Sequence, residues 1–331
     1  MINTSFVRRQ LRIVIQLYKG EFEDGGNTKT IEDLAMTCSI QKLAYPECGK
    51  ASVEIAGMRL ADMEQLSTLA FDPLYVKNNQ LTIYAGDEYH EFSQVFSGTI
   101  TKAGADFNAA PDVKFKMEAS VGYFGRMIAK GPTAINGTQK ADAFIKGQME
   151  QAGFTFQNQG VDTQISDCVF SGSPVQQAQQ CASQIGADLI MDDGEAVLVP
   201  TGAGREGETV VLSKNSGLLG YPTITQNGVE CKAIFDPAFK FGGLVQLETI
   251  VPKASGTWRI VKLTHKLSAN GSDGSWESQI TGLYPNKSPN GKYAYWHRLT
   301  TIPSAALIPR TQTPEHTTPS ISRWSRSSGT G

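Results

Sequence analysis

The sequence predicts a mainly β protein of the α+β class, in which two similar β-domains flank an α/β insertion and an extended tail follows. Before residue 120 and after residue 208, apolar residues alternate with polar ones over many short segments, which is the period of a half-buried strand. Two helix-then-strand units separate these regions. The 33 glycines among the 331 residues suit the many tight turns that join short strands.

Residues 1–120 are predicted to form the first β-domain. Its first strand has apolar residues at every second position from Leu11 to Leu17. Apolar residues about three positions apart, from Leu60 to Leu69, predict one short amphipathic helix. The other strands are expected at residues 34–40, 53–55, 81–84, 95–101 and 113–117. Together they predict a small barrel or sandwich with one helix.

Residues 121–207 are predicted to form an α/β insertion. Its first helix has Thr138 as the expected N-cap, and Gly153 fits the glycine that follows a helix end. A strand at 154–156 comes next. The apolar face of the helix consists of Ala141, Phe144, Ile145, Met149 and Ala152.

The second helix of the insertion has a stronger start signal. Ser173 is an N-cap serine, Pro174 occupies the first helical position and Gln176 stands at the capping-box position. The helical spacing continues to Gly186, and Asp193-Gly194 predicts a hairpin between strands at 189–191 and 196–199.

Residues 208–285 are predicted to form the second β-domain, because the order of features resembles that of the first. A strand at 229–231 takes the place of 53–55, a short turn at 236–239 replaces the helix, and 244–247 corresponds to 81–84. The pair 258–267 and 275–283 corresponds to 95–101 and 113–117. We infer two related β-domains from this order of elements rather than from residue identity.

Residues 286–331 are predicted to form an extended tail that needs a partner to become ordered, because a Pro-, Ser- and Thr-rich segment buries little apolar surface. The tail has six basic residues and one acid, so it is basic whereas the body is acidic within a net charge of -2. An acidic body argues against nucleic acid as its specific ligand. The candidate partner-anchoring residues of the tail are Trp296, Trp324, Arg310 and Arg323.

The search for catalytic, cofactor and metal sites yields no candidate. Residues 202–207 match the string G-x-G-x-x-G, but a strand-like run follows where a dinucleotide site needs a helix, so they are interpreted as a loop. Asp192 and Asp193 are explained by their hairpin turn. His90 is expected at a solvated strand end, and His265 on the exposed face of a strand.

Five widely spaced cysteines without a C-x-x-C pair indicate reduced core residues. The first residues lack the pattern of a signal peptide, and no apolar run has the length of a membrane span. Synthesis in the cytoplasm of the producing cell is therefore expected.

Short motifs in a fixed order resemble the baseplate (tail) hub proteins of contractile-tailed bacteriophages and related contractile injection systems. The similarity spans roughly residues 5–285. It is carried by 51–58 with 63–66, by 170–174 at the start of a helix, and by 220–222, 228–230, 235–237 and 242–245.

The resemblance implies two tube-type β-barrel domains in each chain and a homotrimer that adapts a sixfold tail tube to a threefold central spike. It also implies a location in the virion baseplate, contacts with the tube or its initiator and with wedge proteins, and a lumen through which DNA passes without specific binding. An acidic inner wall would then repel DNA.

Two other functions remain as alternatives: a tail-associated cell-wall-degrading enzyme, which a zymogram would reveal, and a host-surface carbohydrate-binding tail protein, which a glycan array would reveal. We expect the protein to be structural, to have no cofactor and not to be an enzyme.

Overall fold

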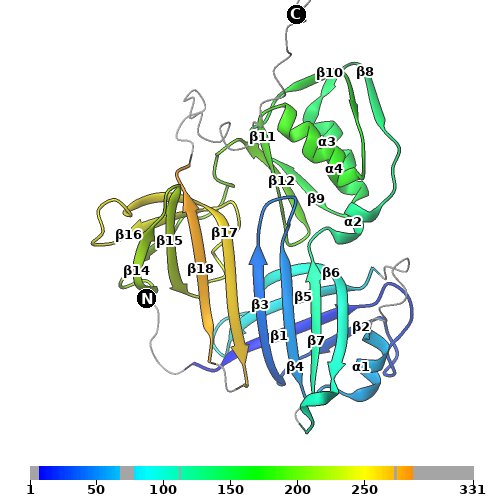
Figure 1. Cartoon of the computed structure of the whole chain (residues 1–331), viewed down its shortest axis with the longest axis vertical. Helices are drawn as coiled ribbons and strands as arrows, with labels where there is room; N and C mark the ends of the chain where they lie inside the picture. Colours follow the sequence, from blue (N-terminus) through cyan, green and yellow to red (C-terminus); the bar gives the residue numbers. More distant parts are fainter. Residues whose placement is uncertain (1–6, 68–77, 112, 272–273, 286–331) are drawn as a thin grey trace, which may run out of the picture. The chain divides into compact units, whose positions relative to one another are not determined.

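In the described part of residues 7–120, the first β-unit contains the six predicted strands, the predicted short α-helix and one further strand, β2, that was not predicted (Figure 1). The computed structural model describes residues 7–67, 78–111, 113–271 and 274–285. The elements of this unit are β1 (Arg9–Gln16), β2 (Thr28–Ile31), β3 (Ala35–Lys42), β4 (Lys50–Ala56), α1 (Leu60–Leu66), β5 (Gln80–Asp87), β6 (Ser93–Asp106), the 3-10 turn η1 (Phe107–Ala109) and β7 (Lys114–Ser120).

The insert, residues 121–207, contains the two predicted helix-then-strand units. Its elements are α2 (Tyr123–Met127), β8 (Thr133–Lys140), α3 (Ala141–Gln151), β9 (Thr155–Asn158), β10 (Gln164–Phe170), α4 (Pro174–Gln184), β11 (Ala187–Asp192) and β12 (Glu195–Pro200). β8 and β10 form a two-stranded sheet, and β11, β12 and β9 form a three-stranded one.

The helix ends of the insert confirm one predicted start and correct the other. Ser173 and Gln176 form the complete capping box at the start of α4. Thr138, in contrast, lies within β8, and α3 begins after Lys140, which gives no side-chain cap. The strand extends into the predicted cap because Thr138 pairs with Ser166 of β10. Gly153 follows α3 with φ +88°, as predicted.

The second β-unit, within residues 208–285, contains β13 (Val210–Ser213), β14 (Leu218–Ile224), β15 (Gly228–Ile234), β16 (Leu244–Glu248), β17 (Gly256–Ala269) and β18 (Trp276–Leu283). Its neighbouring strands occur in the order β15-β18-β17-β16. The first β-unit has the matching order β4-β7-β6-β5. The two units therefore share one pairing scheme, as the order of sequence features suggested.

A shared irregularity aligns the two units residue by residue. The ladder between β6 and β7 shifts between Ile100 and Lys102, and the ladder between β17 and β18 shifts between Ile260 and Lys262. Counting along the ladders from these bulges makes Cys231 of β15 equivalent to Val53 of β4, because the residues opposite them are themselves equivalent. The predicted equivalence of these strands is therefore found in the structure, but residues 229–231 are aligned two positions away from the match with residues 53–55 that the sequence suggested.

The two β-units join through an antiparallel ladder between β3 and β17, which we call the seam. It runs from Lys42 opposite Leu263 to Met36 opposite Ala269 and merges both units into one 13-stranded sheet. Since the described residues belong to one compact unit, domain boundaries near residues 120 and 207 stay predictions.

The main hydrophobic core lies under the first β-unit and continues into the insert. Phe96 and Phe115 are fully buried beneath the sheet, and Ile145 of α3 belongs to the same cluster. Leu267, from the seam end of β17, also packs there, whereas a separate core around Trp258 and Leu263 fills the second unit. The seam strand β17 thus contributes side chains to both cores.

Candidate functional site

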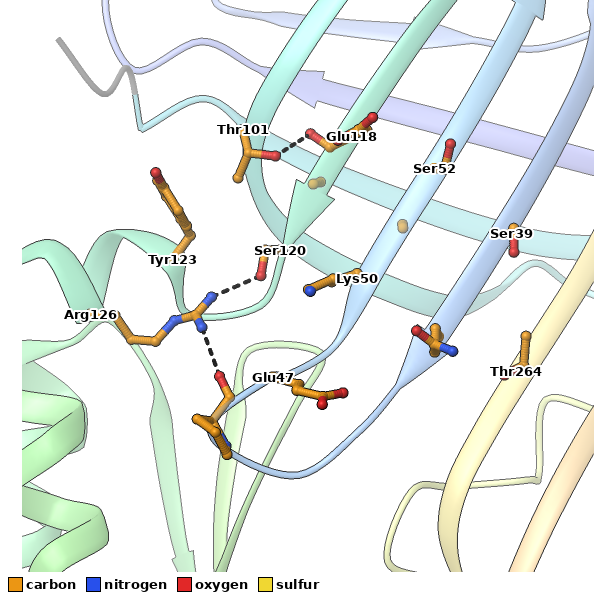
Figure 2. A pocket seen from close by; sticks show the side chains of 14 residues that line it. Ser39, Glu47, Lys50, Ser52, Thr101, Glu118, Ser120, Tyr123, Arg126 and Thr264 are labelled. Carbon is orange, nitrogen blue, oxygen red and sulfur yellow. Dashed lines mark hydrogen bonds between the residues drawn. The ribbon is translucent and has the colours of Figure 1, made fainter. Parts of the chain in front are cut away.

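One face of the joined sheet is polar over the strands from β15 through the seam to β6. Alternate residues of each strand point to this face, for example Ser39 of β3, Ser52 of β4 and Thr264 of β17. A groove of about 610 Å³ runs along it across the seam (Figure 2). The groove is open and lined mainly by polar and charged side chains, which suits a contact or passage surface better than an enclosed ligand pocket.

The contacts within the groove are structural. Arg126 donates from Nη2 to Ser120 Oγ at 2.9 Å and from Nη1 to the carbonyl of Pro46 at 3.2 Å. The Ser120 hydroxyl in turn donates to the carbonyl of Gly49 at 3.3 Å. Figure 2 also shows Thr101 Oγ1, which donates to the carbonyl of Glu118 at 3.1 Å. The bonds of Arg126 and Ser120 hold the loop before β4 and the last turn of α2 to the end of β7.

Charges on the polar face are mixed in sign. Glu54 lies 3.5 Å from Lys114 and 3.6 Å from Lys116, and Lys116 lies 3.5 Å from Asp106. All four side chains are substantially exposed, so each pair stabilises the fold by at most about 1 kcal/mol. The strand lysines of this face are Lys50, Lys102, Lys114, Lys116, Lys232, Lys262 and Lys266, and its strand carboxylates are Glu54, Asp106, Glu118, Glu230 and Glu277.

A buried ionic cluster fixes the insert to the seam. Lys42, the last residue of β3, lies 2.9 Å from Asp192 Oδ1 and 2.6 Å from Asp193 Oδ2, at the tip of the β11–β12 hairpin. Arg205 lies 3.7 Å from Asp192 and forms a close ion pair with Glu195. We call these five residues the Lys42 cluster.

Burial controls the protonation of this cluster. Burial alone would lower the pKa of Lys42, but Asp192 and Asp193 raise it overall, so the ammonium group stays charged. For Asp192, burial raises the pKa in spite of the nearby Lys42. The ion pair therefore depends on both partners remaining in place.

His265 corrects a sequence prediction, because it is buried and not exposed. It lies in the seam opposite Ile40, its Nδ1 is 2.8 Å from Ser278 Oγ, and Phe235 packs edge-on against its ring. Burial, with the charges of Lys42 and Lys240, lowers the pKa of His265 to about 3. The sequence carried the signal, since His265 shares its strand parity with the apolar Leu263 and Leu267.

The same signal identifies Lys42, which the sequence analysis missed. Lys42 continues the inward-facing series of Met36, Cys38 and Ile40, so its position in the pattern is that of a core residue. The hairpin explanation of Asp192 and Asp193 is confirmed, with φ +50° at Asp193, but it is incomplete without Lys42. No pattern in the sequence links residues 42 and 192.

The loop interpretation of residues 202–207 is confirmed, since β13 and no helix follows them. All five cysteines are free, and burial raises the pKa of Cys38 and Cys181 to about 12. His90 is exposed beside Asp87. The predicted anchors Trp296, Trp324, Arg310 and Arg323 lie outside the described residues.

Within the part of the chain that the structure describes, no group of three or more His, Cys, Asp or Glu side chains could hold a metal ion. No helix in this part combines the length and the apolarity needed to span a bilayer.

Solved tail proteins share the fold at low sequence identity. The chain is similar to the 43 kDa tail protein of prophage MuSo2 from Shewanella oneidensis (TM-score 0.55, 10% identity, covering 83% of this chain and 97% of that one). It is also similar to the tail protein from Neisseria meningitidis MC58 (TM-score 0.58, 7% identity, 83% and 96%). A chain of the Francisella PdpA-VgrG complex matches with TM-score 0.53 and 9% identity over 86% of this chain and 54% of that one.

No curated protein sequence matches the chain. The family model described as "Baseplate hub gp41" matches residues 10–277, which include both β-units and the insert. This match confirms the resemblance found in the sequence and gives the protein a structural role in the baseplate of a phage tail. The chain belongs to the baseplate hub gp41 family.

Proposed function

We propose that three copies of this chain form a ring that adapts a sixfold tail tube to a threefold central spike. The observation that carries the proposal is the shared pairing scheme of the two β-units, with bulges just before Lys102 and Lys262, joined edge to edge by the seam. Three chains with two such units each present six similar units to a tube, and three identical chains to a spike. The partners in this proposal are further copies, the spike, the tube or its initiator, and the wedge proteins.

The polar sheet face is the proposed wall of the passage for DNA. This face does not have the excess of carboxylates that the overall charge suggested, since its strands carry seven lysines and five carboxylates. We therefore do not propose that an acidic wall repels the DNA. Instead, lysines are interrupted by carboxylates and hydroxyls, as where Lys102 stands opposite Glu118, so no continuous basic track is offered to phosphates.

The stoichiometry of the assembly tests the ring. Native mass spectrometry of the purified chain, and of hubs released from tails assembled in the bacterial host, is expected to give three copies per hub. A hub with one copy, or with six, would contradict the proposal. The match to a family of structural hub proteins supports the proposed non-enzymatic role.

The basic tail is the proposed contact with a neighbouring subunit, the spike being the partner we favour. Its charge, its tryptophans Trp296 and Trp324 and its arginines Arg310 and Arg323 supply apolar and ionic anchors to a partner that can order it.

Deletion of residues 286–331 is expected to weaken hub-spike association by at least tenfold and to leave the threefold hub intact. Co-purification of spike with full-length and truncated hub, at matched concentrations, measures the effect. The matched control replaces only Trp296 and Trp324 by alanine and should show a smaller loss. Equal spike binding by the truncated and full-length hubs would refute the proposed role of the tail.

A further inference from the structure

The seam by itself leaves the angle between the two β-units variable. It is a single antiparallel ladder, and neighbouring strands of a sheet turn by roughly 10–35° relative to each other. In the proposed ring each of six similar units turns by about 60° from the unit before it. A range of about 25° at the seam is large compared with this step, so the ladder alone does not decide how many chains close a ring.

At one end of the seam, exposed side chains add contacts between the two units. Arg9 of β1 donates from Nη1 to the carbonyl of Gly274 at 3.0 Å, and Arg8 donates from Nη2 to Asn270 Oδ1 at 3.4 Å. Water can replace such exposed hydrogen bonds at little cost in free energy. These contacts therefore restrict the angle only weakly.

At the other end of the seam, strand β11 of the insert contacts both β-units with one face. Asp188, Ile190 and Asp192 alternate along β11 and so point to the same side. Asp192 Oδ1 lies 2.9 Å from Nζ of Lys42, which ends β3 in the first unit. Asp188 Oδ2 lies 2.6 Å from Nη1 of Arg259, near the start of β17 in the second unit. Since four residues of a strand span about 13 Å, the two ion pairs hold β11 at two separate points.

Between the two ion pairs, β11 packs directly against the second unit. Ile190 belongs to a small buried cluster that also contains Phe241. The backbone of Gly242 approaches so closely that a Cβ atom there would lie 2.5 Å from Cδ1 of Ile190. The carbonyl of Gly242 also accepts a hydrogen bond from the backbone N–H of Arg205 at 2.7 Å. The second unit therefore has no room to shift towards β11 at this point.

We propose that β11 is a strut that sets the angle between the two β-units and thereby limits the ring to three chains. This inference rests on the proposed ring. The insert is fixed to the first unit because they share the main hydrophobic core, so the contacts of β11 with Arg259 and Phe241 hold the second unit at one angle to the first. A different angle would close a ring with another number of copies or leave it open.

The number of copies in the hub tests the strut. The variant Asp188→Asn with Arg259→Met removes the ion pair to the second unit without leaving a buried charge unpaired. Native mass spectrometry of the full-length hub is expected to show at least a fivefold larger share of assemblies with copy numbers other than three. The matched control is Arg9→Met, the same substitution at the exposed end of the seam, and it should leave the copy number unchanged. A general loss of stability would lower the yield of folded hub, whereas a change in copy number reports on the angle.

The angle can also be measured within one chain, without reference to the ring. Spin labels at Thr30→Cys in β2 and Glu248→Cys in β16, both exposed positions, report the distance between the units. Cys168, the one cysteine of five that is not buried, is replaced by serine in these chains. With an excess of unlabelled chain, double electron-electron resonance is expected to give a distance distribution at least twice as broad for the double variant as for the wild type or Arg9→Met.

A second variant covers the case in which the double variant does not fold. Phe241→Leu keeps a buried apolar side chain but shortens the contact with Ile190, and it should broaden the distance distribution to a smaller extent. Distributions as narrow as that of the wild type in every folded variant overturn the strut. Broader distributions with an unchanged threefold copy number overturn its role in limiting the ring. A wild-type hub that is not threefold, combined with the expected broadening, rejects the ring and leaves β11 as the element that sets the angle.

Discussion

Replacing Lys42 by methionine is expected to destabilise the protein by about 3–5 kcal/mol, because it removes the ammonium group that pairs with both Asp192 and Asp193 in a buried site. Lys42 and Asp192 are each only 3% exposed, so water cannot replace the lost ion pairs without opening the junction between the insert and the seam. Urea unfolding at pH 7 measures the loss. The exposed Lys50 of the neighbouring strand gives the matched control, and Lys50→Met should change the free energy of unfolding by less than about 0.5 kcal/mol.

Two additional measurements make this result specific. Adding Asp192→Asn and Asp193→Asn to Lys42→Met should restore part of the stability, since the two carboxylates that lost the Lys42 ammonium group are then removed as well. The loss in Lys42→Met should also shrink as the pH falls, because Asp192, whose pKa burial raises, can become neutral by binding a proton. A single variant as stable as the wild type would show that the Lys42 cluster is hydrated and not buried.

Acid is expected to destabilise the protein through His265. Its pKa is about 3 in the folded protein and about 6.5 in the unfolded chain, so between these values only the unfolded chain binds the proton. The contribution of His265 to stability is present above pH 6.5 and is lost as the pH falls towards 3, by about 1.4 kcal/mol per pH unit and up to about 5 kcal/mol in all.

The variant His265→Gln isolates this contribution, because glutamine keeps a hydrogen-bonding group near Ser278 but has no proton to bind. The free energy of unfolding, measured by urea at intervals from pH 6.5 to pH 4, should fall more steeply for the wild type than for the variant. The difference in slope should approach about 1.4 kcal/mol per pH unit near pH 5. Parallel curves would mean that His265 is protonated in the folded protein or exposed to solvent.

Local patterns predicted most of the fold correctly. The alternation from Leu11 to Leu17 predicted β1, and the Ser173-Pro174-Gln176 signal predicted α4, because both depend on neighbouring residues alone. Thr138 was assigned wrongly as a cap because its partner Ser166, 28 residues later, decides that it belongs to a strand. Contacts between distant segments overrode a weak local preference there.

The seam and the Lys42 cluster could not be predicted, since they join residues far apart in the chain. Nothing local pairs Ile40 with His265 or brings Lys42 to Asp192. The sequence did place Lys42 and His265 in the inward parity of their strands. That parity marks both as buried polar residues, which need hydrogen-bonding or ionic partners.

The seam has a kinetic consequence for assembly. Because β3 and β17 are parts of one polypeptide, their encounter is intramolecular and does not depend on protein concentration. In the proposed ring of three chains, half of the six junctions would therefore form within a chain, and only three would remain to form between separate molecules. Gene fusion of two β-units would in this way reduce the molecularity of closure from six to three.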